Sequence, residues 1–145
     1  MLAKLAICAW AFYLGSGIKE APVAADGEQR PKVRLVAIER SIVAATNAER
    51  EQYGLEPLDV DPELMKTARE HCAWMSTNGF FQHTQLPVAE NIAMGQETTD
   101  HVMRSWMGSS GHRANILNGA FRRIGVAAHR TAGGAMFWCQ QFQRN

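Results

Sequence analysis

The stretch "SSGHRANILN" (109–118) sets a histidine and an arginine at the point where a short helix is expected to begin. Ser110 is predicted to cap that helix, because a serine oxygen at this position accepts hydrogen bonds from free backbone amides. A cation at a helix start gains nothing from the helix dipole. We therefore expect Arg113 to donate a forked hydrogen bond, either to a carboxylate such as Glu49 or Glu90 or to loop carbonyls.

On both sides of this stretch the hydrophobic pattern divides the chain into helices followed by a hairpin. Apolar residues recur at spacings of three and four in the predicted helices, and "RTAGG" joins two short apolar segments in the manner of a hairpin turn. A group of helices followed by a C-terminal hairpin indicates an α+β domain rather than alternating βαβ units. The expected helices are 31–53, 61–79, 98–108 and 113–117, and the expected strands are 122–129 and 135–142.

The N-terminus has the pattern of an export signal. Lys4 precedes an uninterrupted apolar run at 5–14, and ten helical residues rise only about 15 Å, half the thickness of a bilayer. A stable transmembrane span is therefore not expected. A secretory signal peptide over 1–25 is predicted, which makes the protein secreted or extracytoplasmic. An uncleaved N-terminal anchor is the alternative interpretation.

The charge balance argues against a nucleic-acid partner. The chain has 15 basic and 14 acidic residues, and loss of residues 1–25 would remove two basic residues and one acidic residue. The remaining formal charge is zero, with no basic block that would displace counterions from a phosphate backbone.

Two cysteines, Cys72 and Cys139, follow the predicted signal peptide. In an oxidising compartment such a pair more often forms a bridge than two free thiols, so a disulfide is predicted. The alternative is two buried, apolar thiols that are not bonded to each other. Cys72 belongs to the predicted buried stripe of helix 61–79, which is the side a bridge requires.

Three residues in separate loops could perform chemistry. His83 and Glu90 lie seven residues apart in a segment broken by Pro87, after Phe80 and Phe81, which are expected to anchor that segment to the core. Two imidazoles and a carboxylate, with His112 as the second imidazole, could bind a divalent cation. They could equally form a general base with an orienting partner. A purely structural role for each histidine is the third possibility.

Six motifs follow one another along the chain: "NAEREQYGLEPL", "FFQHT", "ENIAMG", "SWMGSSGHRANILN", "FRRIGVA" and "FWCQQF". Together they resemble the CAP superfamily, also called the SCP domain, in its bacterial secreted form. That superfamily includes cysteine-rich secretory proteins, plant pathogenesis-related proteins and venom allergens. The resemblance covers Val33 to Phe142, and it implies a CAP domain over 33–143 behind a short leader at 26–32.

The resemblance implies a three-layer α-β-α sandwich with a central antiparallel sheet, and a cleft that gathers histidines and glutamates. His83, Glu90 and His112 match the family pattern, with His83 and His112 as ligands of zinc or another divalent cation. A second glutamate of the eukaryotic pattern follows a tryptophan by three residues, and Ser109 stands there in this chain. Metal affinity is therefore expected to be modest, and to fall below about pH 6.5 because it depends on neutral imidazoles.

Three functions remain open at this level. The first is a secreted binding module whose cleft takes a metal and an extracellular, cell-wall or lipid ligand without turnover. The second is a metal-assisted, peptidase-like hydrolase in which Glu90 is the candidate catalytic base beside His83 and His112. The third is a structural extracellular domain. Arg113 and Asn115 are expected to support the site structurally in each case.

Overall fold

The computed structural model describes residues 33–144. The predicted signal peptide (1–25) and leader (26–32) lie outside the described residues. Within residues 33–144, no helix is long and apolar enough to cross a membrane.

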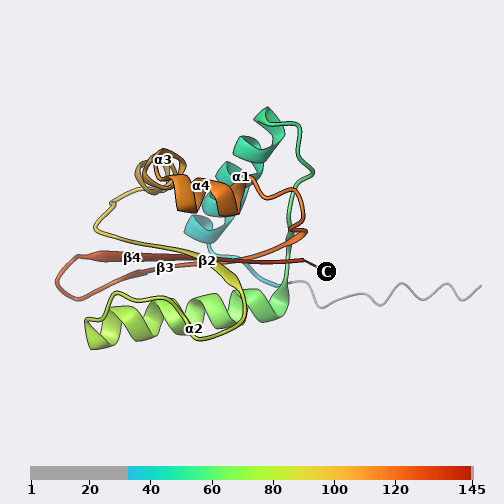
Figure 1. Ribbon diagram of the computed structural model, residues 1–145. Helices are drawn as coiled ribbons and strands as arrows, with labels where there is room; N and C mark the ends of the chain where they lie inside the picture. The colour runs from blue at the N-terminus through green and yellow to red at the C-terminus, as the bar shows by residue number, and fades with distance from the viewer. Residues whose placement is uncertain (1–32, 145) are drawn as a thin grey trace, which may run out of the picture.

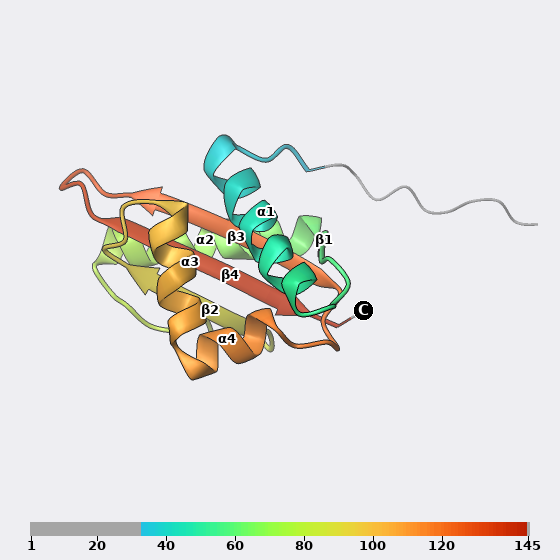
Figure 2. The same ribbon diagram turned by 90° about the horizontal axis from the view of Figure 1, so that it is seen from above.

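The fold has three layers, as Figures 1 and 2 show. One helix, α2, covers one face of a four-stranded sheet, while α1, α3 and α4 cover the other. This arrangement confirms the predicted α-β-α sandwich. The helices are α1 (Ala37–Gln52), α2 (Pro62–Asn78), α3 (Thr99–Gly108) and α4 (Ser110–Ile116), and the strands are β1 (Asp59–Val60), β2 (Ala89–Met94), β3 (Arg123–Arg130) and β4 (Met136–Gln143).

The sheet has the strand order β1-β3-β4-β2. The predicted hairpin forms the antiparallel pair β3–β4, and β2 pairs antiparallel with β4, so the central sheet is antiparallel as expected. The two-residue β1 adds a short parallel pairing with β3. Neither β1 nor β2 was predicted, and β2 matters most because it carries Glu90 at an edge of the sheet.

Helix α2 begins and ends where its sequence signals predict. The Asp61 side chain accepts hydrogen bonds from the amides of Glu63 and Leu64 at 2.9 and 3.1 Å, Pro62 occupies the first turn, and Gly79 ends the helix with a left-handed backbone (φ 69°). Its predicted buried stripe is confirmed, because the four residues concerned are all buried: Leu64, Ala68, Cys72 and Met75.

A buried arginine ties the corner between α4 and β3 together. Arg50 is fully buried, and its guanidinium donates to main-chain carbonyls of Ile116 (2.8 Å), Asn118 (2.9 Å) and Glu56 (2.9 Å). The predicted fork from Arg113 is wrong. Arg113 is exposed and donates to the Tyr53 hydroxyl at 2.8 Å, and its guanidinium lies 5.3 Å from the centre of the Tyr53 ring.

The predicted disulfide is absent among the described residues, where Cys72 and Cys139 are both buried free thiols. Each thiol donates elsewhere, Cys72 to the Phe137 carbonyl at 3.3 Å and Cys139 to Glu90 Oε2 at 3.5 Å. Burial raises the pKa of Cys72 to about 12, so this thiol stays protonated at neutral pH. The structure therefore agrees with the alternative interpretation of this pair, two buried thiols that are not bonded to each other.

Candidate functional site

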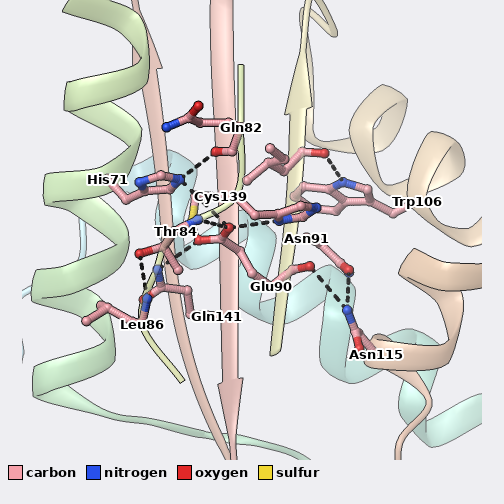
Figure 3. A network of polar contacts seen from close by, with 12 residues as sticks. His71, Gln82, Thr84, Leu86, Glu90, Asn91, Trp106, Asn115, Cys139 and Gln141 are labelled. Carbon is pink, nitrogen blue, oxygen red and sulfur yellow. Dashed lines mark hydrogen bonds and ion pairs between the residues drawn. The ribbon is translucent and has the colours of Figure 1, made fainter. Parts of the chain in front are cut away.

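The site is built around the carboxylate of Glu90, shown in Figure 3. Glu90 lies on β2 and is only 7% exposed. Its Oε1 accepts hydrogen bonds from His83 Nδ1 and the Thr84 amide, both at 2.9 Å. Its Oε2 accepts from Gln141 Nε2 at 2.9 Å and from the Cys139 thiol at 3.5 Å. A carboxylate has about four lone-pair positions, so all of them are engaged.

These donors hold Glu90 in the ionised form. Burial alone raises the pKa of Glu90, but the hydrogen bonds from Gln141, Thr84 and His83 outweigh it, and the pKa lies below its ordinary value. The thiol of Cys139 is also a donor here, since burial and the nearby carboxylate raise its pKa. Glu90 is thus an anchored anion, without a free lone pair for a metal or an attacking water.

His83 is oriented by this anchor. An ionised carboxylate only accepts, so His83 Nδ1 must carry the proton that Glu90 Oε1 receives. Its side chain is 59% exposed, and in the neutral ring Nε2 has an open lone pair on the side away from Glu90. A carboxylate that fixes one imidazole nitrogen leaves the other directed toward a ligand or metal.

His112 lies on α4 and lines a cavity of about 300 Å³ together with Ser109 and Trp106. No described residue is hydrogen-bonded to its ring. Burial lowers the pKa of His112, and the proximity of the His83 charge lowers it further. His112 therefore stays neutral to a lower pH than an ordinary histidine. His83 lines a different pocket, of about 160 Å³, together with His71 and Gln82, so the predicted pairing of the two imidazoles stays a prediction.

Helix α4 begins at Ser110, three residues before the predicted start at 113, and its cap differs from the predicted one. Ser109, not Ser110, is the N-cap, and the side chain of Ser109 makes no capping hydrogen bond. Its hydroxyl is instead one of the groups that line the His112 cavity. Ser110 is the first helical residue and is exposed. The position where the family pattern carries an acid is thus a neutral hydroxyl on the cavity wall.

Asn115 links α4 to β2. Its side-chain amide donates to the Glu90 carbonyl at 3.2 Å and to the Asn91 side chain at 2.9 Å. Asn91 in turn donates to the His112 carbonyl at 3.1 Å and to Gln140 Oε1 at 3.1 Å. These contacts fix α4 against β2, and they set the distance between the His112 and Glu90 sides of the site.

The sequence did not assign His71 to the site. His71 projects from α2, and its Nε2 contacts the Gln82 carbonyl at 2.9 Å and lies 3.8 Å from Glu90 Oε1. One sequence signal could have assigned His71 to the site. His71 directly precedes Cys72, and so lies at the edge of the face of α2 that packs on the sheet. The polar pair "QQ" inside an otherwise apolar strand is a second missed signal, because Gln141 binds Glu90.

The predicted anchoring of the loop by Phe80 and Phe81 is wrong. Phe80 is 57% exposed and Phe81 50% exposed. Phe80 stacks on Trp74, which stacks on His71, with ring centroids 5.8 Å apart in both pairs. Polar contacts to Glu90 and Gln82 hold the loop, so the phenylalanines are available to line its outer surface.

The donor set permits only a two-histidine metal site. Among residues 33–144 no group of three or more histidine, cysteine, aspartate or glutamate side chains is placed to hold a metal ion. Glu90 is saturated and Ser109 is neutral, which leaves His83 Nε2 and the His112 ring as ligands. A cation held there would take its remaining ligands from water or from a bound molecule.

Residues 43–142 match the family described as CAP, the Cysteine-rich secretory protein family. The chain belongs to this family. This finding confirms the resemblance on which the predicted fold and cleft were based.

The chain is similar to proteins of several sources. It is 39% identical over 124 residues to the uncharacterised protein YkwD of Bacillus subtilis (strain 168). This match covers 73% of the chain and 47% of YkwD. It therefore spans about half the length of this curated relative.

Two solved structures show the same fold. An extracellular protein containing a SCP domain from Bacillus anthracis str. Ames superposes with a TM-score of 0.65 and 25% identity, over 79% of this chain and 45% of that one. The structure of NaASP2 with Zn²⁺ superposes with a TM-score of 0.61 and 13% identity, over 72% of this chain and 78% of that one.

Proposed function

We propose that the protein is a secreted, non-catalytic binding module whose ligand enters the cleft between His83 and His112. The observation that carries the proposal is the saturation of Glu90. A carboxylate with four donors on its oxygens orients His83 and has no lone pair to spare for activating water.

The same observation disfavours the hydrolase. A general base must lie within hydrogen-bond reach of the proton that it abstracts. Glu90 is buried behind His83, Thr84 and Gln141, and the eukaryotic pattern's second acid is replaced by Ser109. A purely structural role is disfavoured by His112, whose half-buried ring lines a cavity and is hydrogen-bonded to no described residue.

We propose that a divalent cation such as zinc is held by His83 Nε2 and the ring of His112. Bound there, it would supply a positive centre for a carbonyl, carboxylate or phosphate oxygen of a ligand. The similarity to NaASP2, solved with Zn²⁺, supports this assignment. With two protein ligands, affinity should be modest, and an extracytoplasmic location fits the extracellular description of the Bacillus anthracis protein.

Calorimetric titration of the domain with zinc at about pH 7.5 tests the proposal, because both imidazoles compete with protons below that range. One site per chain is expected, with at least a tenfold loss of affinity in His83→Ala and in His112→Ala. His101→Ala is the matched control, since His101 is exposed on α3.

Peptidase and esterase assays, with and without zinc, test the absence of turnover. The proposal predicts no hydrolysis above that of His112→Ala. Zinc binding that is unchanged in both histidine variants, or hydrolysis that disappears in Glu90→Gln while the fold is retained, would contradict it.

A further inference from the structure

The segment of residues 81–87, which carries His83, is held in place by side chains. Figure 1 shows that this segment, between α2 and β2, runs back along α2. In the described part of the chain, no main-chain hydrogen bond joins residues 81–87 to a helix or to another strand; the Val88 N–H donates to the Leu86 carbonyl next to it. The position of His83 therefore depends on the side chains that bind this segment.

Two side chains bind the main chain directly beside His83. On its C-terminal side, the Thr84 N–H donates to Glu90 Oε1 at 2.9 Å. On its N-terminal side, Nε2 of His71 lies 2.9 Å from the Gln82 carbonyl oxygen (Figure 3). A carbonyl oxygen only accepts, so Nε2 of His71 must carry a proton and donate it. The chain is thus anchored on both sides of His83, by His71 on one side and by Glu90 on the other.

The ring of His71 is itself held in place by aromatic stacking. The His71 side chain is 10% exposed, and its ring stacks on the Trp74 ring with centroids 5.8 Å apart and an interplanar angle of 12°. The Trp74 ring stacks in turn on Phe80, at 5.8 Å and 19°. Three nearly parallel rings therefore join α2 to the residue that precedes the segment. The stack fixes the plane of the imidazole and the direction in which its Nε2 points.

Anchoring of the segment also decides the tautomer of His83. The His83 side chain is 59% exposed, so its contact with Glu90, rather than a surrounding pocket, sets the orientation of the ring. A neutral imidazole without such a partner favours the proton on Nε2, which is the nitrogen that a ligand needs. Release of the Gln82 carbonyl would let the His83 ring turn away from Glu90 into solvent and take up that other tautomer.

We infer that His71 is a positioning residue for His83. By holding the Gln82 carbonyl, His71 keeps His83 Nδ1 on Glu90 and leaves Nε2 free to bind. Residues that orient a metal-binding histidine in this indirect way change metal affinity by about tenfold to a hundredfold. The inference rests on the proposed function for what Nε2 binds, whereas the tautomer of His83 can be measured without any metal.

Two substitutions separate the hydrogen bond of His71 from its ring. His71→Phe keeps an aromatic ring that can stack on Trp74 but cannot donate, whereas His71→Gln keeps a donor in the position of Nε2 and loses the ring. In ¹⁵N NMR of the zinc-free domain, His83 should carry its proton on Nδ1 in the wild type and in His71→Gln, and mainly on Nε2 in His71→Phe. Zinc affinity should fall about tenfold or more in His71→Phe and less than about threefold in His71→Gln.

His129→Phe is the matched control. His129 is exposed on β3, and its Nδ1 lies 2.8 Å from the hydroxyl of Ser76 on α2, so it also links α2 to another element without contacting the segment. This control should leave the His83 tautomer unchanged. If His71 has a structural role alone, His71→Phe should lower the melting temperature and leave the His83 tautomer as in the wild type.

An unchanged His83 tautomer in His71→Phe would overturn the inference. So would a wild-type domain in which Nε2 of His71 carries no proton, a measurement that needs no variant. The two proposals fail separately. A tautomer change in His71→Phe, together with a wild-type domain that binds no zinc, would support the positioning role and contradict the proposed metal site.

Discussion

At the scale of the residue, Glu90 is the centre of the site because four donors converge on it. Substitution Glu90→Gln keeps the shape but turns an amide NH₂ toward groups that also donate. We expect a loss of about 2–4 kcal/mol in the free energy of unfolding, measured by urea titration. The control is Glu97→Gln, at an exposed position. Equal stability of the two variants would show that Glu90 is not a structural anchor.

Arg50 is a second residue whose contacts make a specific prediction. Substitution Arg50→Lys keeps the charge, but one ammonium group cannot reach carbonyls of Glu56, Ile116 and Asn118 together. A loss of about 3 kcal/mol is expected, since buried carbonyls remain unpaired. The exposed Arg113→Lys should change stability by less than about 0.5 kcal/mol. Thermal unfolding of both variants measures the difference.

At the scale of the element, the packing of α2 on β3 depends on a glycine. A Cβ on Gly125 would lie 2.1 Å from the backbone carbon of Leu64 and 2.5 Å from the nitrogen of Met65. Gly125→Ala must therefore push the start of α2 away from the sheet, and we expect a loss of about 3 kcal/mol or more. Gly111→Ala, where nothing lies within 4 Å of the added carbon, is the control and should be neutral or stabilising.

The cap of α2 makes the stability depend on pH. Burial alone raises the pKa of Asp61, but hydrogen bonds from the Leu64 amide and Arg123 outweigh it and hold the pKa below its ordinary value. The unfolded chain therefore takes up a proton more readily, so this stabilisation is present above about pH 4 and is lost as pH falls through the folded pKa. Asp61→Asn keeps the cap acceptor without the charge.

Urea unfolding at several pH values checks this prediction. The difference in stability between the wild-type domain and Asp61→Asn should be largest near pH 7 and should shrink below about pH 4. A difference that is constant with pH would contradict the assignment of the charge to Asp61.

At the scale of the whole molecule, local signals predicted the elements that depend on nearby residues. Asp61, Pro62 and Gly79 define α2 because capping and glycine geometry act within a few residues. The hairpin β3–β4 was predicted in the same way, from the turn residues "RTAGG" between two apolar segments. The family motifs singled out His83, Glu90 and His112, and no spacing rule could show the contact that His83 makes with Glu90.

Contacts between distant segments were not predictable. Arg50 binds carbonyls more than sixty residues away, and Gln141 contacts Glu90 from the neighbouring strand, 51 residues away in the sequence. Neither partner is visible in the local pattern. The cysteines show the same limit. Their number and predicted compartment favoured a bridge, whereas the geometry directs each thiol to a different acceptor.

We propose that Glu90 orients His83 so that Nε2 meets the ligand together with His112. The most direct measurement is ¹⁵N NMR of the imidazole nitrogens, before and after addition of zinc. We predict that His83 carries its proton on Nδ1 and that His83 Nε2 and one His112 nitrogen shift together at one zinc per chain. A proton on His83 Nε2, or shifts at His101 or His129 with none at His83 and His112, would contradict this role of Glu90.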